Sequence, residues 1–393
     1  MPTIYKNTRG QHAVRQWCID AIARATFPLA TATVHTSAGR ISLTSAGTGR
    51  TRVVLVPGTG FNAAVTLPWL EALSLRWPTT VVDLPGQPGL SDPRRPRPAR
   101  LTWYDRILAE VLEGIDAERV VLVGNSLGAA VALAAGSSRI AGRALISPAG
   151  FMRLSLDPKL AVASSLWLLQ PTAEHTRRLL RMFVAPGEEP PETEVEWMTL
   201  LAACCRTTLA PPPLPAELLA RRARLPCAVA VGEHDRFLPP RRLLPAVRRT
   251  IKVESRVFPS VGHLITPDHL DEVVSLVAEL SMRWMRRSTD EPSDSCTAHL
   301  RHRRWCHAPN GALDRRRYPP WIQPLAPRRE STRPWRTSRS ADRQLRARRH
   351  ACGRVCHRRT SSLAVRTRRE LGPDPACGRG HRARAGVNDA DHL

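Results

Sequence analysis

Short apolar runs alternate with amphipathic stretches along the middle of the chain. Residues 52–56, 79–83, 119–124 and 143–147 are apolar on both faces of an extended backbone, which is typical of buried parallel strands. The stretches between them repeat apolar residues at intervals of three and four, which predicts helices. This alternation predicts an α/β fold with a mostly parallel sheet. The predicted helices cover residues 65–77, 102–117 and 127–136.

Further elements precede and follow this series. Residues 10–27 have the spacing of an amphipathic helix. Residues 30–36 and 40–45 alternate polar and apolar positions around Ser37-Ala38-Gly39, which predicts a β-hairpin. The α/β pattern resumes after residue 225, so we expect a sheet of eight strands. The downstream elements are strands at 226–235 and 252–258 and helices at 239–250 and 267–287.

Residues 148–225 interrupt the alternation. Their pattern is helical, two proline-rich stretches break it, and large apolar residues such as Trp167, Phe183 and Trp197 are frequent. A sheet that is interrupted once by helices predicts a core domain with a helical cap. The expected domains are an N-terminal helical extension (1–29), the core (30–147 and 226–287), the cap (148–225) and a tail (288–393).

The tail, residues 288–393, shows no periodicity. It contains 24 arginines, no lysine and 10 acidic residues, and its low apolar content predicts a disordered basic segment. Two explanations stay open: an arginine-rich arm that folds on nucleic acid, and a shifted reading frame without a selected function. Because the whole chain has only three lysines, the arginine bias indicates base composition rather than selection for phosphate contacts. We therefore favour the second explanation.

The remaining composition narrows the class of protein. The four cysteines before the tail have neither disulfide nor zinc spacing, and the N-terminus has no signal-peptide pattern. The longest apolar run, residues 160–169, is about half as long as a bilayer span. Residues 1–287 carry no dense basic stripe. We expect a cytoplasmic protein without a metal, membrane or nucleic-acid partner, and the sequence does not indicate its oligomeric state.

A serine lies between two glycines where the third central strand meets the following helix. Residues Gly124, Asn125, Ser126, Leu127 and Gly128 fit the pattern G-x-S-x-G. Glycines are needed because so tight a turn leaves no room for side chains. The turn exposes the Ser126 hydroxyl above the strand ends and places the Leu127 amide beside it, while Asn125 is interpreted as a local turn residue.

An acid and a base follow the serine in chain order. Asp235 comes just after the strand CAVAVG, and His263 follows the last strand by a short loop. Because the carboxyl ends of parallel strands meet at one edge, Ser126, Asp235 and His263 are expected to converge as nucleophile, acid and base. The flanking Glu233 and His234 are weaker candidates, and His269 is interpreted as a surface histidine inside the last helix.

The loop after the first central strand, residues 55–62, is expected to supply a second amide donor. Thr59 is the favoured N–H donor and Gly60 the next. The same loop also fits G-x-G-x-x-A at residues 58–63, and Asp83 ends the next strand, so a dinucleotide-binding site is a rival hypothesis. Pro57 before the first glycine and the long preceding segment argue against it.

These motifs resemble the α/β-hydrolase superfamily over about residues 30–285, and the N-terminal helix and hairpin resemble its carboxylesterase-like members. The resemblance implies Ser126 as nucleophile, Asp235 as orienting acid and His263 as base, with Asp83 structural and no cofactor. Pro57-Gly58 in place of the usual His-Gly, and Ala129 in place of glycine, depart from the family pattern. The matching motifs are LVPGTG, VVDLPGQPGLSD, VGNSLG, ALISPAG, VGEHDRFLPP and FPSVGH.

The expected activity is a serine hydrolase that cleaves a carboxylic ester, or a related acyl bond, of a small apolar molecule through an acyl-enzyme. C–C bond hydrolysis and cofactor-free haloperoxidase chemistry on the same residues are alternatives. A ligand-binding receptor with vestigial hydrolase activity is another, because function does not follow from fold. The remaining alternative function is an NAD(P)-binding oxidoreductase.

Overall fold

The computed structural model describes residues 3–94, 100–155, 157–206, 212–222 and 224–290. The predicted disordered tail lies outside the described residues from 291 onward. The last helix continues to Asp290, three residues beyond its predicted end at residue 287. Among the helices within these ranges, none is both long enough and apolar enough to cross a bilayer.

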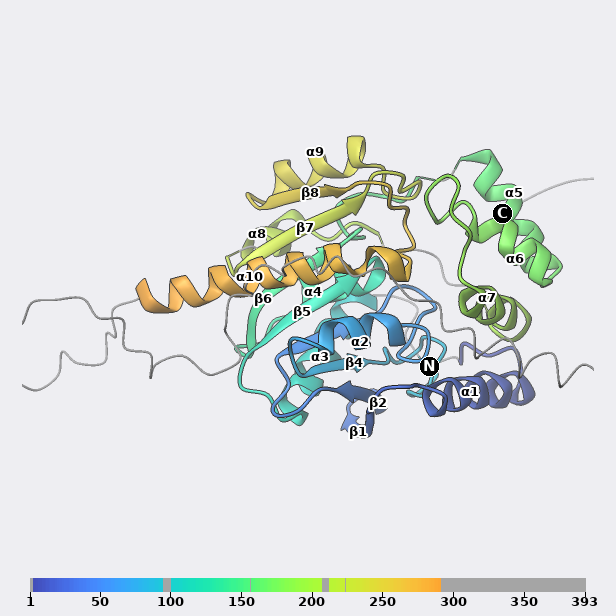
Figure 1. The fold of residues 1–393 in the computed structure, drawn as a ribbon, viewed down its shortest axis with the longest axis horizontal. Helices are drawn as coiled ribbons and strands as arrows, with labels where there is room; N and C mark the ends of the chain where they lie inside the picture. The colour runs from blue at the N-terminus through green and yellow to red at the C-terminus, as the bar shows by residue number, and fades with distance from the viewer. Residues whose placement is uncertain (1–2, 95–99, 156, 207–211, 223, 291–393) are drawn as a thin grey trace, which may run out of the picture. The chain divides into compact units, whose positions relative to one another are not determined.

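Eight strands form one sheet in the order β1-β2-β4-β3-β5-β6-β7-β8 (Figure 1). The hairpin β1–β2 is antiparallel and joins β4 in antiparallel pairing, whereas the pairs from β4 to β8 are parallel. The predicted eight-stranded, mostly parallel sheet is therefore confirmed. The strands are β1 (Ala30–Thr36), β2 (Gly39–Ala46), β3 (Val53–Val56), β4 (Thr79–Val82), β5 (Val120–Asn125), β6 (Ile140–Ile146), β7 (Cys227–Gly232) and β8 (Glu254–Phe258).

Both faces of the sheet are buried by helices. Val54 and Leu122 pack into one apolar cluster with α3, α4 and α9, whereas Val53 and Val121 pack into a second cluster with α2 and α10. Successive strand residues point to opposite faces, so continuously apolar strands fill both clusters. The helices are α2 (Leu67–Ser74), α3 (Arg100–Gly114), α4 (Leu127–Ala134), α9 (Pro240–Thr250) and α10 (Leu270–Asp290).

Four helices lie between β6 and β7 among the residues that the structure describes there. Three of them lie with α1 beyond the end of the sheet to which the strand arrows point (Figure 1). The fourth, α8, packs instead against α4 and α9. The inserted helices are α5 (Pro158–Leu169), α6 (Ala173–Leu180), α7 (Glu192–Cys204) and α8 (Ala216–Arg222).

Terminal residues fix the bounds of the first and last helices. Helix α1 (Thr8–Ala23) begins two residues before the predicted start, because the Asn7 side chain accepts a hydrogen bond from the Gly10 amide at 2.7 Å and caps the helix. The predicted helix at 267–287 instead begins with a separate 3-10 turn, η1 (Pro267–His269), before α10.

Two arginines complete the C-terminal end of α4. Arg143, which is fully buried, donates hydrogen bonds to the carbonyls of Ala132 and Ala135 at 2.9 and 2.8 Å. Arg222 donates to the Ala134 carbonyl at 3.0 Å. The last carbonyls of a helix have no partner within it, and they carry its partial negative charge. The two cations therefore stabilise a short helix whose residues are all buried.

The first turn of α7 buries a carboxyl group. Glu194 is 7% exposed, and this burial raises its pKa from 4.5 to about 7, although its own backbone amide favours the charged form. Between those values the folded state binds the proton more tightly than the unfolded chain. The free energy of unfolding therefore falls as pH rises from about 4.5 to about 7.

Replacing this carboxyl group by an amide should remove that pH dependence. Above about pH 8, the free energy of unfolding of Glu194→Gln is expected to exceed that of wild type by at most about 3 kcal/mol. Near pH 4 the two proteins should have the same free energy of unfolding. Urea denaturation across this range measures both. The control is Glu196→Gln, an exposed position on the same helix, which should keep the wild-type slope. Equal slopes for wild type and Glu194→Gln would contradict the expectation.

Candidate active site

Ser126 occupies a strained turn between β5 and α4. Its φ of 52° and ψ of −111° lie outside the regions that a serine ordinarily adopts. The strain is held by its neighbours: its amide donates to the Ile146 carbonyl at 3.0 Å, and its carbonyl accepts from Ala130 and Ala149. Such strain is maintained only where the surrounding structure enforces it, and it is common at functional sites.

The glycines of this turn are required by the close approach of backbones. A Cβ atom on Gly128 would lie 1.9 Å from the Val56 carbonyl oxygen, at the end of β3. A Cβ atom on Gly124 would lie 2.6 Å from the backbone of Ala129. Helix α4 therefore packs directly against the ends of β3 and β5, which is possible only with glycine at both positions.

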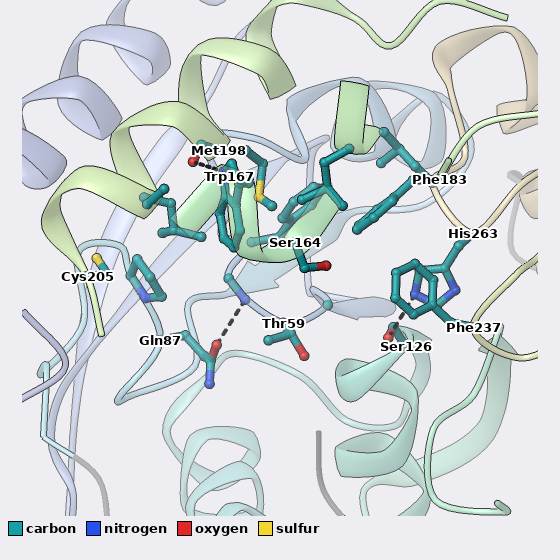
Figure 2. A pocket seen from close by; sticks show the side chains of 18 of the residues that line it. Thr59, Gln87, Ser126, Ser164, Trp167, Phe183, Met198, Cys205, Phe237 and His263 are labelled. Atoms are coloured by element: carbon teal, nitrogen blue, oxygen red, sulfur yellow. Dashed lines mark hydrogen bonds between the residues drawn. The ribbon is translucent and has the colours of Figure 1, made fainter. Parts of the chain in front are cut away.

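The structure brings the three predicted side chains together in a line of hydrogen bonds. His263 Nε2 lies 3.2 Å from Ser126 Oγ, and His263 Nδ1 lies 2.8 Å from Asp235 Oδ2 (Figure 2 shows the serine and histidine). Asp235 follows β7 and His263 follows β8, so neighbouring parallel strands deliver both to the edge where Ser126 lies. This geometry allows a proton to move from the serine to the histidine.

Asp235 is held in its charged form. Its side chain is completely buried, which by itself would raise the pKa of the carboxyl group. The charge and hydrogen bond of His263, with the Leu238 amide at 2.8 Å, outweigh this effect and hold the pKa below its usual range. The Phe237 amide donates to the same carboxylate at 2.9 Å. A charged Asp235 keeps the proton on the Nδ1 atom of His263.

The competing acids and bases have other partners. Glu233 accepts a hydrogen bond from the Ser260 amide at 3.0 Å. The neighbouring His234 lies 3.9 Å from Glu233. His269 was predicted inside the last helix, but it belongs to the preceding turn η1. Its side chain is 20% exposed, and its Nε2 lies 2.6 Å from Glu188 Oε1.

Two of the candidate amide donors have no other hydrogen-bond partner among the described residues. The amides of Thr59 and Leu127 donate to no other atom in the part of the chain that the structure describes. The Gly60 amide, by contrast, donates to Gln87 Oε1 at 2.9 Å. Thr59 is exposed and lines the same cavity as Ser126. The geometry thus favours Thr59 over Gly60 as the second donor.

Gly60 is held from both sides by residues that the sequence reasoning missed. Besides the Gln87 bond to its amide, its carbonyl accepts a hydrogen bond from Trp197 Nε1 at 2.8 Å. Gln87 Nε2 in turn donates to the Tyr104 hydroxyl at 3.1 Å. Gly60 has a φ of 77°, which favours glycine. One residue of the loop is therefore fixed jointly by the segment after β4 and by α7.

Ser126 opens into a mainly apolar cavity of about 270 Å³ (Figure 2). The cavity lies between the loop that contains Thr59 and the helices α5 and α7, and Figure 2 shows Cys205 at the end remote from Ser126. Asn125, expected only as a turn residue, also lines it, and its buried Nδ2 has no hydrogen-bond partner among the described residues. Much of the apolar lining comes from Trp167, Phe183, Met198, Leu201, Phe237 and Leu264.

The residues of the rival dinucleotide site have different roles. Residues 58–63 do not open a helix, because α2 begins only at Leu67. Asp83 is fully buried, and its carboxylate accepts hydrogen bonds from the amides of Ala63 and Leu90 at 2.8 and 3.0 Å. Burial raises the pKa of Asp83, and these two amides oppose the rise. The carboxylate therefore ties two loops together and does not face a ligand.

Within the described ranges, no group of three or more histidine, cysteine, aspartate or glutamate side chains is placed to hold a metal ion.

Comparison with solved structures shows the same fold at low sequence identity. Naproxen esterase of Bacillus subtilis superposes with a TM-score of 0.59 and 18% identity, over 71% of this chain and 100% of that one. Carboxylesterase CesB of the same organism gives a TM-score of 0.58 and 16% identity, over 70% and 99%. A serine hydrolase involved in carbazole degradation gives a TM-score of 0.51 and 15% identity, over 65% of this chain and 100% of that one.

The sequence itself gives a second line of comparison. No curated protein matches it significantly. The model of the alpha/beta hydrolase family, however, matches residues 53–276, which extend from β3 into α10 and include all three residues of the hydrogen-bonded line. This match spans more than half of the chain and agrees with the sheet order and the turn around Ser126, and the protein therefore belongs to the alpha/beta hydrolase family.

Proposed function

We propose that the protein is a serine hydrolase that cleaves a carboxylic ester of a small apolar molecule. The observation that carries this proposal is the hydrogen-bonded line from Ser126 through His263 to Asp235, which opens into an apolar cavity. The similarity in fold to naproxen esterase and carboxylesterase CesB supports an ester as the substrate. No cofactor is needed for this reaction.

We assign a role to each residue on the basis of this geometry. His263 Nε2 accepts the proton of Ser126 Oγ as that oxygen attacks the ester carbonyl. Asp235 keeps the proton on Nδ1 and stabilises the imidazolium that forms. The amides of Leu127 and Thr59 bind the developing oxyanion, and each such donor contributes about 3 kcal/mol to transition-state stabilisation. His263 then protonates the leaving alcohol.

The second half of the reaction uses the same groups in reverse order. His263 takes a proton from water, the hydroxide attacks the acyl group on Ser126, and the serine regains its proton as the carboxylic acid leaves. Helix α4 begins at Leu127, so its N-terminal partial positive charge lies beside the oxyanion in both halves. The preorganised donors need no rearrangement between the two steps.

The cavity limits the substrate to a small apolar group. Its volume of about 270 Å³ is at the lower end of the range for small-molecule sites. Aromatic and aliphatic side chains from α5, α7 and the segments around Phe183 and Phe237 form most of its wall. Burial of an alkyl or aryl group there contributes binding energy in proportion to its area.

The nucleophile is tested by covalent labelling with a fluorophosphonate probe. Wild type should be labelled and should hydrolyse p-nitrophenyl esters, and Ser126→Ala should lose the label and about 10⁴-fold or more of the rate. Asp235→Asn should lose rate by a similar factor, because the histidine then adopts the wrong tautomer. Ser165→Ala, a serine that bonds within α5, is the control and should be labelled normally. An unlabelled wild type would refute the proposal.

Removal of the hydrogen bond from Trp197 to Gly60 tests whether this bond positions the loop. Trp197→Phe keeps an aromatic ring beside Trp17, whose ring centre lies 4.8 Å away, but loses the N–H donor to Gly60. We expect kcat to fall about five- to tenfold with little change in KM, since one hydrogen bond contributes about 1 kcal/mol. Affinity for a trifluoromethyl ketone that mimics the tetrahedral intermediate should fall by the same factor.

A matched tryptophan separates this effect from general loosening of the cavity. Trp167→Phe also removes one indole hydrogen bond, to the Met198 carbonyl at 3.0 Å, and Trp167 does not bond to the loop of Gly60. It should alter KM through the cavity wall and retain kcat. Equal losses of kcat in both variants would show that the bond to Gly60 has no special role.

A further inference from the structure

The N-terminal strap, which we define as Thr3–Lys6, is hydrogen-bonded to the end of α7. The Lys6 amide donates to the Cys204 carbonyl at 2.8 Å, and the Arg206 amide donates to the Ile4 carbonyl at 2.8 Å. The Arg206 guanidinium adds bonds from its Nη1 atom to two further carbonyls of the strap, at 3.0 and 2.9 Å. A segment near the start of the chain therefore pairs with one some 200 residues later.

The other edge of the strap is fixed to the segment after β4. The Ile4 amide donates to the Pro93 carbonyl at 3.2 Å. The Tyr5 hydroxyl lies 3.4 Å from the Gly89 carbonyl, and burial raises the pKa of Tyr5, so the phenol stays neutral. The strap thus joins the end of α7 to the β4 side of the site, and both of its edges are held by backbone hydrogen bonds.

Ile4 lines the cavity close to the end that is remote from Ser126. Its side chain lines the cavity and is only 3% exposed. Tyr5, the next residue, pairs with Cys205. Figure 2 shows Cys205 at one end of the cavity and Ser126 with His263 at the other. An apolar group that starts at Ser126 and extends along the cavity therefore ends at Ile4.

We infer that Ile4 is a specificity-determining residue that limits the length of the acyl chain of the ester. This inference rests on the proposed function. The acyl group stays bonded to Ser126 after the alcohol has left, so we assign the arm of the cavity that runs from Ser126 toward Ile4 to the acyl group. The lining of the cavity is mainly apolar, which favours an alkyl chain. Chains that reach Ile4 fill the arm, and longer ones clash with a strap that is held on both edges.

Hydrolysis of p-nitrophenyl esters from acetyl to decanoyl tests the inference. Ile4→Ala should move the highest kcat/KM to a longer acyl chain and raise the ratio of long-chain to short-chain kcat/KM about tenfold. Ile4→Phe should move the highest kcat/KM to a shorter acyl chain and lower the ratio of long-chain to short-chain kcat/KM by a similar factor. The conservative Ile4→Val should shift the highest kcat/KM in the same direction as Ile4→Ala, but by less. Val14→Ala is the control, because Val14 is buried in the same apolar cluster but does not line the cavity.

Two outcomes of this series would overturn the inference. One is an unchanged chain-length profile in all Ile4 variants, and the other is an equal shift in Val14→Ala, which would show a general loosening of the N-terminal region.

Binding of free fatty acids of the same lengths to Ser126→Ala, with and without Ile4→Ala, is measured by calorimetry. If wild type hydrolyses no ester, the proposed function fails, and the length of the tightest-binding fatty acid alone then decides the inference.

Discussion

The contact between α4 and the end of β3 is the constraint on which the site depends. At Gly128 the helix backbone comes so close to the Val56 carbonyl that no side chain fits between them. This contact fixes where the helix begins, and Ser126, at that point, is held in its strained conformation. This packing contact therefore positions Ser126 and the start of α4, whereas the loop of Thr59 is held separately by Trp197 and Gln87.

Because α4 is short and completely buried, the carbonyls at its C-terminal end need hydrogen-bond donors from the protein. The eight residues of α4 are all buried, so water cannot solvate its last carbonyls. Arg143 and Arg222 supply the donors instead. Burial lowers the pKa of Arg143 to about 10, which still leaves the guanidinium charged at neutral pH. The cation thus remains paired with the negative end of the helix dipole.

Local pattern was enough to predict the sheet and the convergence of Ser126, His263 and Asp235, but not the hydrogen bonds that hold the neighbouring loop. Val53 to Val56 are all apolar, which indicates a strand buried on both faces, and the order of Ser126, Asp235 and His263 follows from strand ends that share one edge. Trp197 could not be assigned in this way, because apolar periodicity indicates only that a tryptophan is buried. Its bond to Gly60 joins residues 137 positions apart, and Gln87 likewise acts through a contact that only the folded chain creates.

The bond between Trp197 and Gly60 has a consequence for any movement of α7. Helix α7 forms part of the cavity wall and also holds the loop that carries Thr59. An outward displacement of α7 by more than about 1 Å would stretch this bond, which is 2.8 Å long, beyond hydrogen-bonding distance. The shape of the cavity wall and the position of the Thr59 loop are thus coupled through one hydrogen bond.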